Sequence, residues 1–223
     1  MKKIIDLTHK ITNNMPVFPG DPKVEIDNAI FGDKSAYNVS IVKMGSHTGT
    51  HIDAPSHLTF LNNGLQSISL SKLIGIAEVI DLGNIKPDSI IEVSQIIPHI
   101  DRIKPNGKII LKTNWSRYWN TPDYFLSYPS ISIESAELFA DRDIDMLAIE
   151  QPSTHQILHE QIHSILLSKG IIILENLANT SEINADTVYL TVLPLNIENI
   201  DGSPVRAVAV VYPESVMEQL EQA

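Results

Sequence analysis

A dense cluster of histidine and aspartate side chains, near the end of the first quarter of the sequence, constrains the fold more than any other feature. The segment reads His-Thr-Gly-Thr-His-Ile-Asp-Ala-Pro-Ser-His and contains His47, His51, Asp53 and His57. Imidazole nitrogens and carboxylate oxygens bind borderline divalent metals such as zinc and manganese. Gly49 permits a sharp turn, and the following proline stiffens the exit of the segment. The rest of the chain must therefore hold this loop and bring further polar groups to it.

The spacing within the loop predicts which side chains meet. Side chains two residues apart point to the same side of an extended segment, so His51 and Asp53 share a face. His47 lies beyond the Thr-Gly-Thr turn and can fold back toward them. These three side chains suffice for a catalytic metal that keeps a position open for water, and the second carboxylate oxygen of Asp53 could bridge to a second metal. The alternative is a set of ordinary surface histidines beside a turn.

The composition limits the possible partners and ligands. The 223 residues are 43% hydrophobic and 19% charged, which is enough for one domain over residues 1–223 with a substantial core. The net charge of −11 argues against nucleic acid as a partner, because a phosphate backbone requires a basic face. The chain has no cysteine, so any metal must be held by His, Asp, Glu or other oxygen ligands.

The sequence shows no signal for export or for insertion into a membrane. Met1 is followed by two lysines, but no long apolar run comes after them, so we expect no signal peptide. No stretch approaches the apolar length that is needed to cross a bilayer. We therefore expect a cytoplasmic protein that acts without a membrane.

Strand and helix patterns are mixed along the chain, which predicts an α/β fold with substantial sheet content. Strands are predicted over residues 2–8, 23–31, 37–44, 77–82, 108–113, 146–150, 171–174, 187–195 and 205–212. Helices are predicted over residues 65–74, 90–97, 132–140 and 153–167, with a helical tail from Pro213. The proline-rich segment Asn13–Pro22 predicts an irregular loop.

A second histidine cluster lies on one of the predicted helices. His155, His159 and His163 are four residues apart and would share one helix face. The segment His159-Glu-Gln-Ile-His163 also matches the H-E-x-x-H pattern of zinc peptidases, in which two histidines bind zinc and the glutamate acts as base. A metzincin would carry a third histidine where this chain has Lys169, and a peptidase would leave the first histidine cluster without a function.

Two further features could complete a site. Glu175 ends the apolar strand predicted over residues 171–174, where a buried acid is costly unless a metal or a hydrogen-bonding partner compensates it. The alternative is a carboxylate that reaches solvent. Six aromatic side chains without a clean period could cover a pocket, form an interface or pack in the core: Trp115, Tyr118, Trp119, Tyr124, Phe125 and Tyr128. The lone histidines His9 and His99 receive no role.

These residues resemble a known family. The segment from His47 to His57 matches the H-x-G-T-H-x-D-x-P-x-H signature of the cyclase family of metal-dependent hydrolases at all seven specified positions. That family includes bacterial kynurenine formamidase (arylformamidase) and isatin hydrolase. Met15-Pro-Val-Phe-Pro-Gly-Asp21 resembles its early proline-rich loop, and His163, followed twelve residues later by Glu175-Asn-Leu, resembles its late metal-binding segment.

The resemblance implies a fold and a ligand set. The fold is a swivelling β/β/α-type domain with a mixed sheet, assembled as a homo-oligomer (dimer or tetramer). His47, His51 and Asp53 are implied to bind a first divalent metal. Asp53 would bridge to a second metal that His163 completes, with Glu175 reaching one or both ions. Zinc is the expected metal, with two ions per chain possible, and manganese is the alternative.

The implied chemistry is hydrolysis of an amide-type carbon–nitrogen bond. Zinc lowers the pKa of bound water to about 7, so hydroxide is available to attack the carbonyl carbon while the metals stabilise the oxyanion. His57 is implied to be the acid/base group, and its ordinary pKa of about 6.5 suits proton transfer to the leaving nitrogen.

The implied substrate is a small molecule, either an aryl formamide such as N-formylkynurenine or a cyclic amide. Kynurenine formamidases place a Trp where Phe18 stands, so we expect Phe18 to contact the substrate with a smaller ring. A metal-binding protein that retains the fold without catalysis is the alternative.

Overall fold

Eight strands form one mixed sheet in the computed structural model, which describes residues 2–29 and 37–221. Their order in the sheet is β1, β12, β11, β5, β7, β9, β10, β4. The strands are β1 (Lys3–Asp6), β4 (His51–Asp53), β5 (Ile74–Asp81), β7 (Lys108–Lys112), β9 (Met146–Ile149), β10 (Ile172–Glu175), β11 (Thr187–Pro194) and β12 (Gly202–Val211). Strands β5, β7, β9 and β10 run parallel and the other neighbours pair antiparallel, so the predicted mixed α/β class is confirmed.

The sheet closes into a barrel because the short strand β4 pairs on both sides. One edge of β4 pairs with β10, and the other edge pairs with the first residues of β12. The later part of β12 pairs with β1 instead. Since β4 consists of His51, Ile52 and Asp53, the closure of the barrel also holds the histidine loop in place.

Successive residues of the parallel strands face two different cores. Val79 and Ala148 lie in the core that includes residues of β11 and β12, whereas their neighbours Ile80 and Leu147 lie in the core that includes the helices. Side chains alternate between the two faces of a strand, so a strand buried on both faces consists of consecutive apolar residues. This explains the unbroken apolar runs at β7, β9 and β10.

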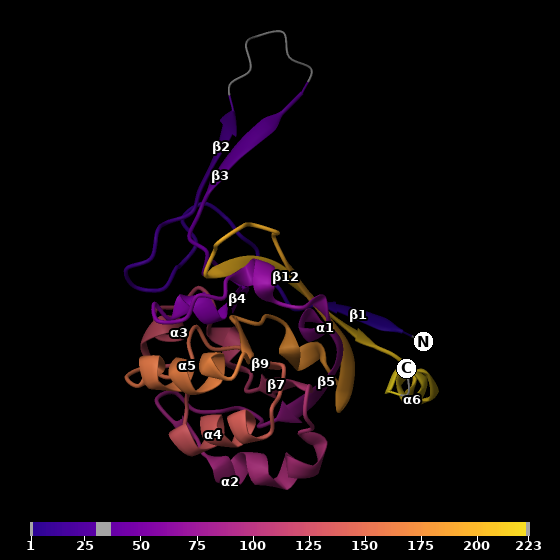
Figure 1. Ribbon diagram of the computed structural model, residues 1–223. Helices are drawn as coiled ribbons and strands as arrows, with labels where there is room; N and C mark the ends of the chain where they lie inside the picture. The colour runs from indigo at the N-terminus through magenta and orange to yellow at the C-terminus, as the bar shows by residue number, and fades with distance from the viewer. Residues whose placement is uncertain (1, 30–36, 222–223) are drawn as a thin grey trace.

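Most of the helices lie on one side of the barrel, whereas the C-terminal helix lies apart from them, near the two ends of the chain (Figure 1). The helices are α1 (Leu70–Leu73), α2 (Val93–Ile96), α3 (Asp123–Leu126), α4 (Ile133–Asp141), α5 (His159–Ser168) and α6 (Glu214–Glu221). The 3₁₀ helices are η1 (Pro55–His57), η2 (Leu65–Ser67), η3 (Ile97–Arg102), η4 (Trp115–Tyr118) and η5 (Thr180–Glu182), and β6 (Ile90–Ile91) pairs with β8 (Ser130–Ile131). No helix among the described residues is long and apolar enough to cross a membrane.

A hairpin stands away from the barrel (Figure 1). Its strands β2 (Glu25–Ala29) and β3 (Val39–Lys43) pair antiparallel, as the sequence predicts. All five residues of β3 are exposed, including Val39, Ile41 and Val42. The last two residues of the strand predicted over residues 23–31 lie outside the described residues.

Three helix predictions are wrong in their extent, two of them in the first half of the chain. The helix predicted over residues 65–74 is divided into η2 and α1, because the Ser69 side chain caps α1 by accepting from the Ser71 N–H. The helix predicted over residues 90–97 starts as β6, and Pro98 lies within η3 instead of ending a helix. Proline fits there because the first helical positions need no N–H donor.

The helix predicted over residues 153–167 begins only at His159. His155 lies before it, and its Nδ1 accepts the N–H groups of Ile157 and Leu158. The prediction that three histidines share one helix face is therefore wrong for His155. Gly170, with φ of +73°, follows the helix as predicted.

Candidate metal centre and substrate pocket

The strand register brings the predicted metal ligands together at the closing point of the barrel. In the antiparallel pairing of β10 with β4, Glu175 lies directly opposite His51. Asp53 is two residues along β4, so its side chain shares the face of His51 while that of Ile52 points into the core. Gly49 has φ of +63°, which turns the chain before β4.

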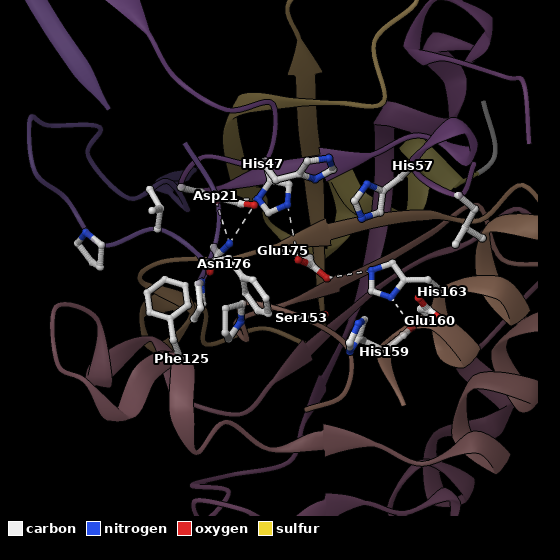
Figure 2. A pocket seen from close by; sticks show the side chains of 18 of the residues that line it. Asp21, His47, His57, Phe125, Ser153, His159, Glu160, His163, Glu175 and Asn176 are labelled. Atoms are coloured by element: carbon white, nitrogen blue, oxygen red, sulfur yellow. Dashed lines mark hydrogen bonds and ion pairs between the residues drawn. The ribbon is translucent and has the colours of Figure 1, made fainter. Parts of the chain in front are cut away.

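Asp53 lies at the centre of the cluster. Its Oδ1 is 2.7 Å from Nδ1 of His47 and 3.3 Å from Nε2 of His51. Its Oδ2 is 3.4 Å from Nε2 of His163, which comes from α5. Glu175 is 3.6 Å from Nε2 of His51 through Oε2, and 3.6 Å from Nε2 of His163 through Oε1. Figure 2 shows the side chains of His163 and Glu175 pointing toward each other.

Two of the histidines are oriented by backbone carbonyls. Nδ1 of His51 donates to the carbonyl of Gly49 at 2.8 Å, and Nδ1 of His163 donates to the carbonyl of His159 at 2.7 Å. A carbonyl oxygen only accepts, so these contacts place a proton on Nδ1 and make Nε2 the atom that could bind a metal once it is deprotonated. Metal-binding histidines are held in this way in many proteins.

The two buried carboxylates are incompletely satisfied. Asp53 and Glu175 are 1% and 4% exposed, and within residues 2–29 and 37–221 the buried atoms Asp53 Oδ2 and Glu175 Oε1 have no hydrogen-bond partner. Two overlapping sets bring one ligand atom from each residue within 4.8 Å of the others: His47, Asp53 and His57, and His51, Asp53 and Glu175. Unpaired buried oxygens are costly, and a cation would remove that cost. The donor set therefore fits a divalent metal ion.

The buried carboxylate of Glu150, by contrast, accepts hydrogen bonds at both of its oxygens. Glu150 is fully buried, and its Oε1 accepts the N–H groups of Thr113 and Asn114 at 2.8 and 2.9 Å. Its Oε2 accepts the N–H of Ser116 at 2.8 Å. Glu150 thus anchors the start of η4 and needs no cation, in contrast to Asp53 and Glu175.

The carboxylates change the proton affinity of the histidines. Burial alone would lower the pKa of His47, but the charges and hydrogen bonds of Asp53 and Asp201 outweigh burial and raise it to about 10. Burial also lowers the pKa of His163, but its contacts with the carboxylates of Asp53 and Glu175, at 3.4 and 3.6 Å, outweigh burial and raise this pKa to about 10. Without a metal, protonated imidazoles balance the buried carboxylates. A metal ion would replace those protons.

Asp201 is a site residue that the sequence did not reveal. It precedes β12, and its Oδ2 lies 2.9 Å from Nε2 of His47 and 3.6 Å from Nδ1 of His57. Hydrogen bonds with these two histidines hold the pKa of Asp201 well below its usual range. The next residue, Gly202, leaves no room for a side chain, since a Cβ there would lie 2.7 Å from Cε1 of His47.

His57 lies at the entrance side of the same cluster. Its ring is 4.1 Å from that of His47, and its side chain is 35% exposed. The structure therefore brings His57 close enough to act either as a ligand or as a proton carrier, and its acid/base role stays a prediction.

The cluster forms one side of a cavity of about 800 Å³. Phe18, Trp119 and Phe125 also line this cavity, and we call these three residues the aromatic wall. Phe125 contacts the other two, with ring centroids 6.3 Å from Phe18 and 6.2 Å from Trp119. Figure 2 shows Phe125 on the side of the cavity opposite His57 and His163. The aromatic run thus divides, because Trp115, Tyr124 and Tyr128 are buried in a core of their own.

The H-E-x-x-H segment does not form a ligand pair. His159 is exposed and lies in neither ligand set found among the described residues. Its contribution to the cluster is the backbone carbonyl that orients His163. The geometry gives no support to the zinc-peptidase alternative.

Comparison with known proteins agrees with this geometry. A family model described as "Putative cyclase" matches residues 5–156, which is more than half of the chain. The chain belongs to this cyclase family. It is 31% identical over 211 residues to the kynurenine formamidase of Geobacillus thermodenitrificans (93% of this chain, 97% of the relative). It is 29% identical over 209 residues to that of Bacillus cereus (92% and 95%).

Solved structures of the family share the fold. Isatin hydrolase A from Labrenzia aggregata, bound to benzyl benzoate, superimposes with a TM-score of 0.84 at 26% identity, covering 95% of this chain and 94% of that chain. A protein described as a potential metal-dependent hydrolase with cyclase activity gives a TM-score of 0.80 at 25% identity, covering 96% and 100%. The closed mixed sheet is therefore a property that this chain shares with its family.

Proposed function

We propose that this protein is a metal-dependent hydrolase of an amide-type carbon–nitrogen bond in a small molecule. The observation that carries the proposal is the pair of buried carboxylates, Asp53 and Glu175, beside three histidines at the side of a large cavity, each with one oxygen that accepts no hydrogen bond from the described residues. The kynurenine formamidase and isatin hydrolase relatives support amide hydrolysis.

The proposed ligands divide into two groups around Asp53. His47, His51 and Asp53 would hold one divalent ion, and Asp53, His163 and Glu175 would hold a second. Nitrogen and oxygen donors suit zinc and manganese alike. When bound, such ions lower the pKa of a coordinated water and polarise a carbonyl oxygen.

The remaining residues bind the substrate and move its protons. His57 lines the cavity and carries a proton to the leaving nitrogen, while Asp201 lies 3.6 Å from its Nδ1 and orients the ring. The aromatic wall packs against the substrate and excludes water from the reacting bond. This arrangement suits an aryl formamide such as N-formylkynurenine or a cyclic amide.

We also propose that the chain forms a homo-oligomer through the β2–β3 hairpin. A two-stranded hairpin is barely stable alone, and this one stands away from the barrel with Val39, Ile41 and Val42 exposed by 46%, 59% and 52%. A second copy of the chain would cover these side chains. Replacing Ile41 and Val42 by serine is expected to yield a monomer in light scattering, and an unchanged mass would contradict this assignment.

The test of the function is hydrolysis by the purified protein before and after chelation. We expect it to hydrolyse N-formylkynurenine, formanilide or isatin, to lose activity in chelator, and to recover with zinc or manganese. Activity that survives complete removal of metal would contradict the mechanism. Bound metal without hydrolysis of any of these substrates would favour a non-enzymatic metal-binding protein.

A further inference from the structure

His9, which the sequence left without a role, lies directly behind the aromatic wall. Its imidazole stacks on the indole of Trp119 with ring centroids 3.8 Å apart and an interplanar angle of 11°. His9 is only 9% exposed, so the contact is largely shielded from water. The indole thus has the substrate cavity beside it and an imidazole packed flat against it.

Trp119 packs against the aromatic core of Trp115, Tyr124 and Tyr128, and His9 lies flat against its ring. Trp119 follows η4, a short 3₁₀ helix, and is only partly buried. Its other close ring contact is Tyr124, edge-on at 4.9 Å and 85°, with Phe125 farther away at 6.2 Å. His9 therefore makes the one flat contact that restrains the indole among the ring contacts of the described residues.

A second cavity lies beside His9. His9 lines a cavity of about 410 Å³ together with Asn114 and Arg117, whereas Trp119 lines the substrate cavity. The His9–Trp119 stack therefore separates the two spaces. Without the imidazole, the indole would have open volume to move into, away from the substrate.

Hydrogen bonds connect the backbone of His9 to the segment that precedes His51. The His9 N–H donates to Oγ1 of Thr50 at 2.9 Å, and this hydroxyl donates to the carbonyl of Asn176 at 2.6 Å. The Asn176 amide in turn donates to the carbonyl of Gly49 at 3.0 Å and accepts from the Tyr124 hydroxyl at 2.8 Å. The two rings that support Trp119 are thus attached to the segment that presents His51.

The imidazole of His9 acts as a neutral ring. Burial lowers its pKa to about 4, so it carries no charge near neutrality. Its Nε2 has no hydrogen-bond partner among the described residues, so this ring nitrogen makes no polar contact there that would account for a histidine at position 9. The stacking contact is what the ring provides.

We propose that His9 is a positioning residue that holds Trp119 as a rigid face for an aromatic ring of the substrate. The inference rests on the proposed hydrolysis for its kinetic test. A second test needs no substrate, so a failure of the positioning role of His9 can be distinguished from a failure of the proposed hydrolysis.

The kinetic test compares formanilide, which has an aromatic ring, with N-methylformamide, which has none. In His9→Ala the ratio of kcat/KM for formanilide to that for N-methylformamide is expected to fall about three- to tenfold, mainly through KM for formanilide. His9→Phe, which restores a ring, is expected to recover part of the ratio. His9→Asn, which leaves a smaller void, is expected to behave like His9→Ala, so the test survives a failure of the alanine variant to fold.

A double-substitution experiment tests whether His9 affects the ratio of kcat/KM values through Trp119. If His9 acts through Trp119, then His9→Ala has no further effect on the ratio in a Trp119→Ala background. A loss of the same size in both backgrounds would overturn the proposal. His99→Ala is the matched control, because His99 lies in η3 outside both cavities and its substitution is expected to leave the ratio unchanged.

The test without substrate is the near-ultraviolet circular dichroism of the indoles. The chain has two tryptophans, and Trp115 is fully buried in the separate aromatic core. His9→Ala is expected to weaken the tryptophan band, and the difference is expected to vanish in a Trp119→Ala background. A band that is identical in wild type and all His9 variants would overturn the proposal even if the protein hydrolyses amides.

Discussion

The metal centre and the aromatic wall line the same cavity but are built in different ways. The centre takes His51, Asp53 and Glu175 from paired strands: β4, which holds His51 and Asp53, pairs on both sides, and Glu175 pairs with His51. The wall takes Phe18 from a proline-rich loop and Trp119 from the end of a 3₁₀ helix, and both are only partly buried. The strands thus hold the groups proposed for the chemistry, whereas loops present the groups proposed to select the substrate.

The comparison predicts that the largest losses come from the centre. Asp53→Asn keeps the shape of the side chain but removes the charge that two proposed metals would share. We expect kcat/KM to fall on the order of a thousandfold, since metal stabilisation of the transition state contributes several kcal/mol. Steady-state kinetics with circular dichroism as a folding control measures this. A loss below tenfold in a folded variant would contradict the bridging role.

His57→Ala tests whether His57 is an acid/base group or a metal ligand. We expect kcat to fall about a hundred- to ten-thousandfold with the metal content unchanged, because general acid–base catalysis contributes that much. Metal analysis of the purified variant distinguishes the two roles that the geometry allows. Loss of metal in this variant would reassign His57 as a ligand.

Asp201→Asn is expected to have an intermediate effect. The carboxylate contacts His47 and His57 from outside the proposed ligand set, and groups in such positions change metal affinity or activity by about ten- to a hundredfold. Metal titration and kinetics of the variant would measure both. If neither changes, the contacts of Asp201 are incidental.

The wall is expected to give the smallest effect. Phe18→Trp enlarges a ring that lines the cavity, and an added aromatic contact strengthens binding about two- to tenfold. We therefore expect a lower KM for N-formylkynurenine and little change in kcat. A fall in kcat that matched a substitution in the centre would remove the distinction between the two regions.

The same difference explains how much the sequence could predict. The proposed ligands His47, His51 and Asp53 lie within seven residues, so strand alternation and one turn bring them together, and the resemblance added His163 and Glu175. Asp201 was missed because it meets His47 only when β12 pairs with β4, a contact between residues 154 positions apart. Nothing near Asp201 in the sequence signals that pairing.

The sequence could not predict, for a similar reason, which aromatic side chains between Trp115 and Tyr128 line the cavity. Trp115 and Trp119 are separated by one turn of 3₁₀ helix, yet one is buried in a core and the other lines the cavity. A short irregular segment has no period from which the facing side can be deduced. The extent of the helix at His159 was overestimated because His155 turns the chain by accepting backbone N–H groups, which helical spacing alone does not reveal.

The most direct test of the central claim is a titration of the metal-free protein with zinc or manganese, followed by calorimetry. The account predicts bound metal in the wild-type chain, loss of that binding in Asp53→Asn, and fewer or more weakly bound ions in Glu175→Gln. Binding of equal strength in wild type and in both variants, or no binding at all, would contradict it.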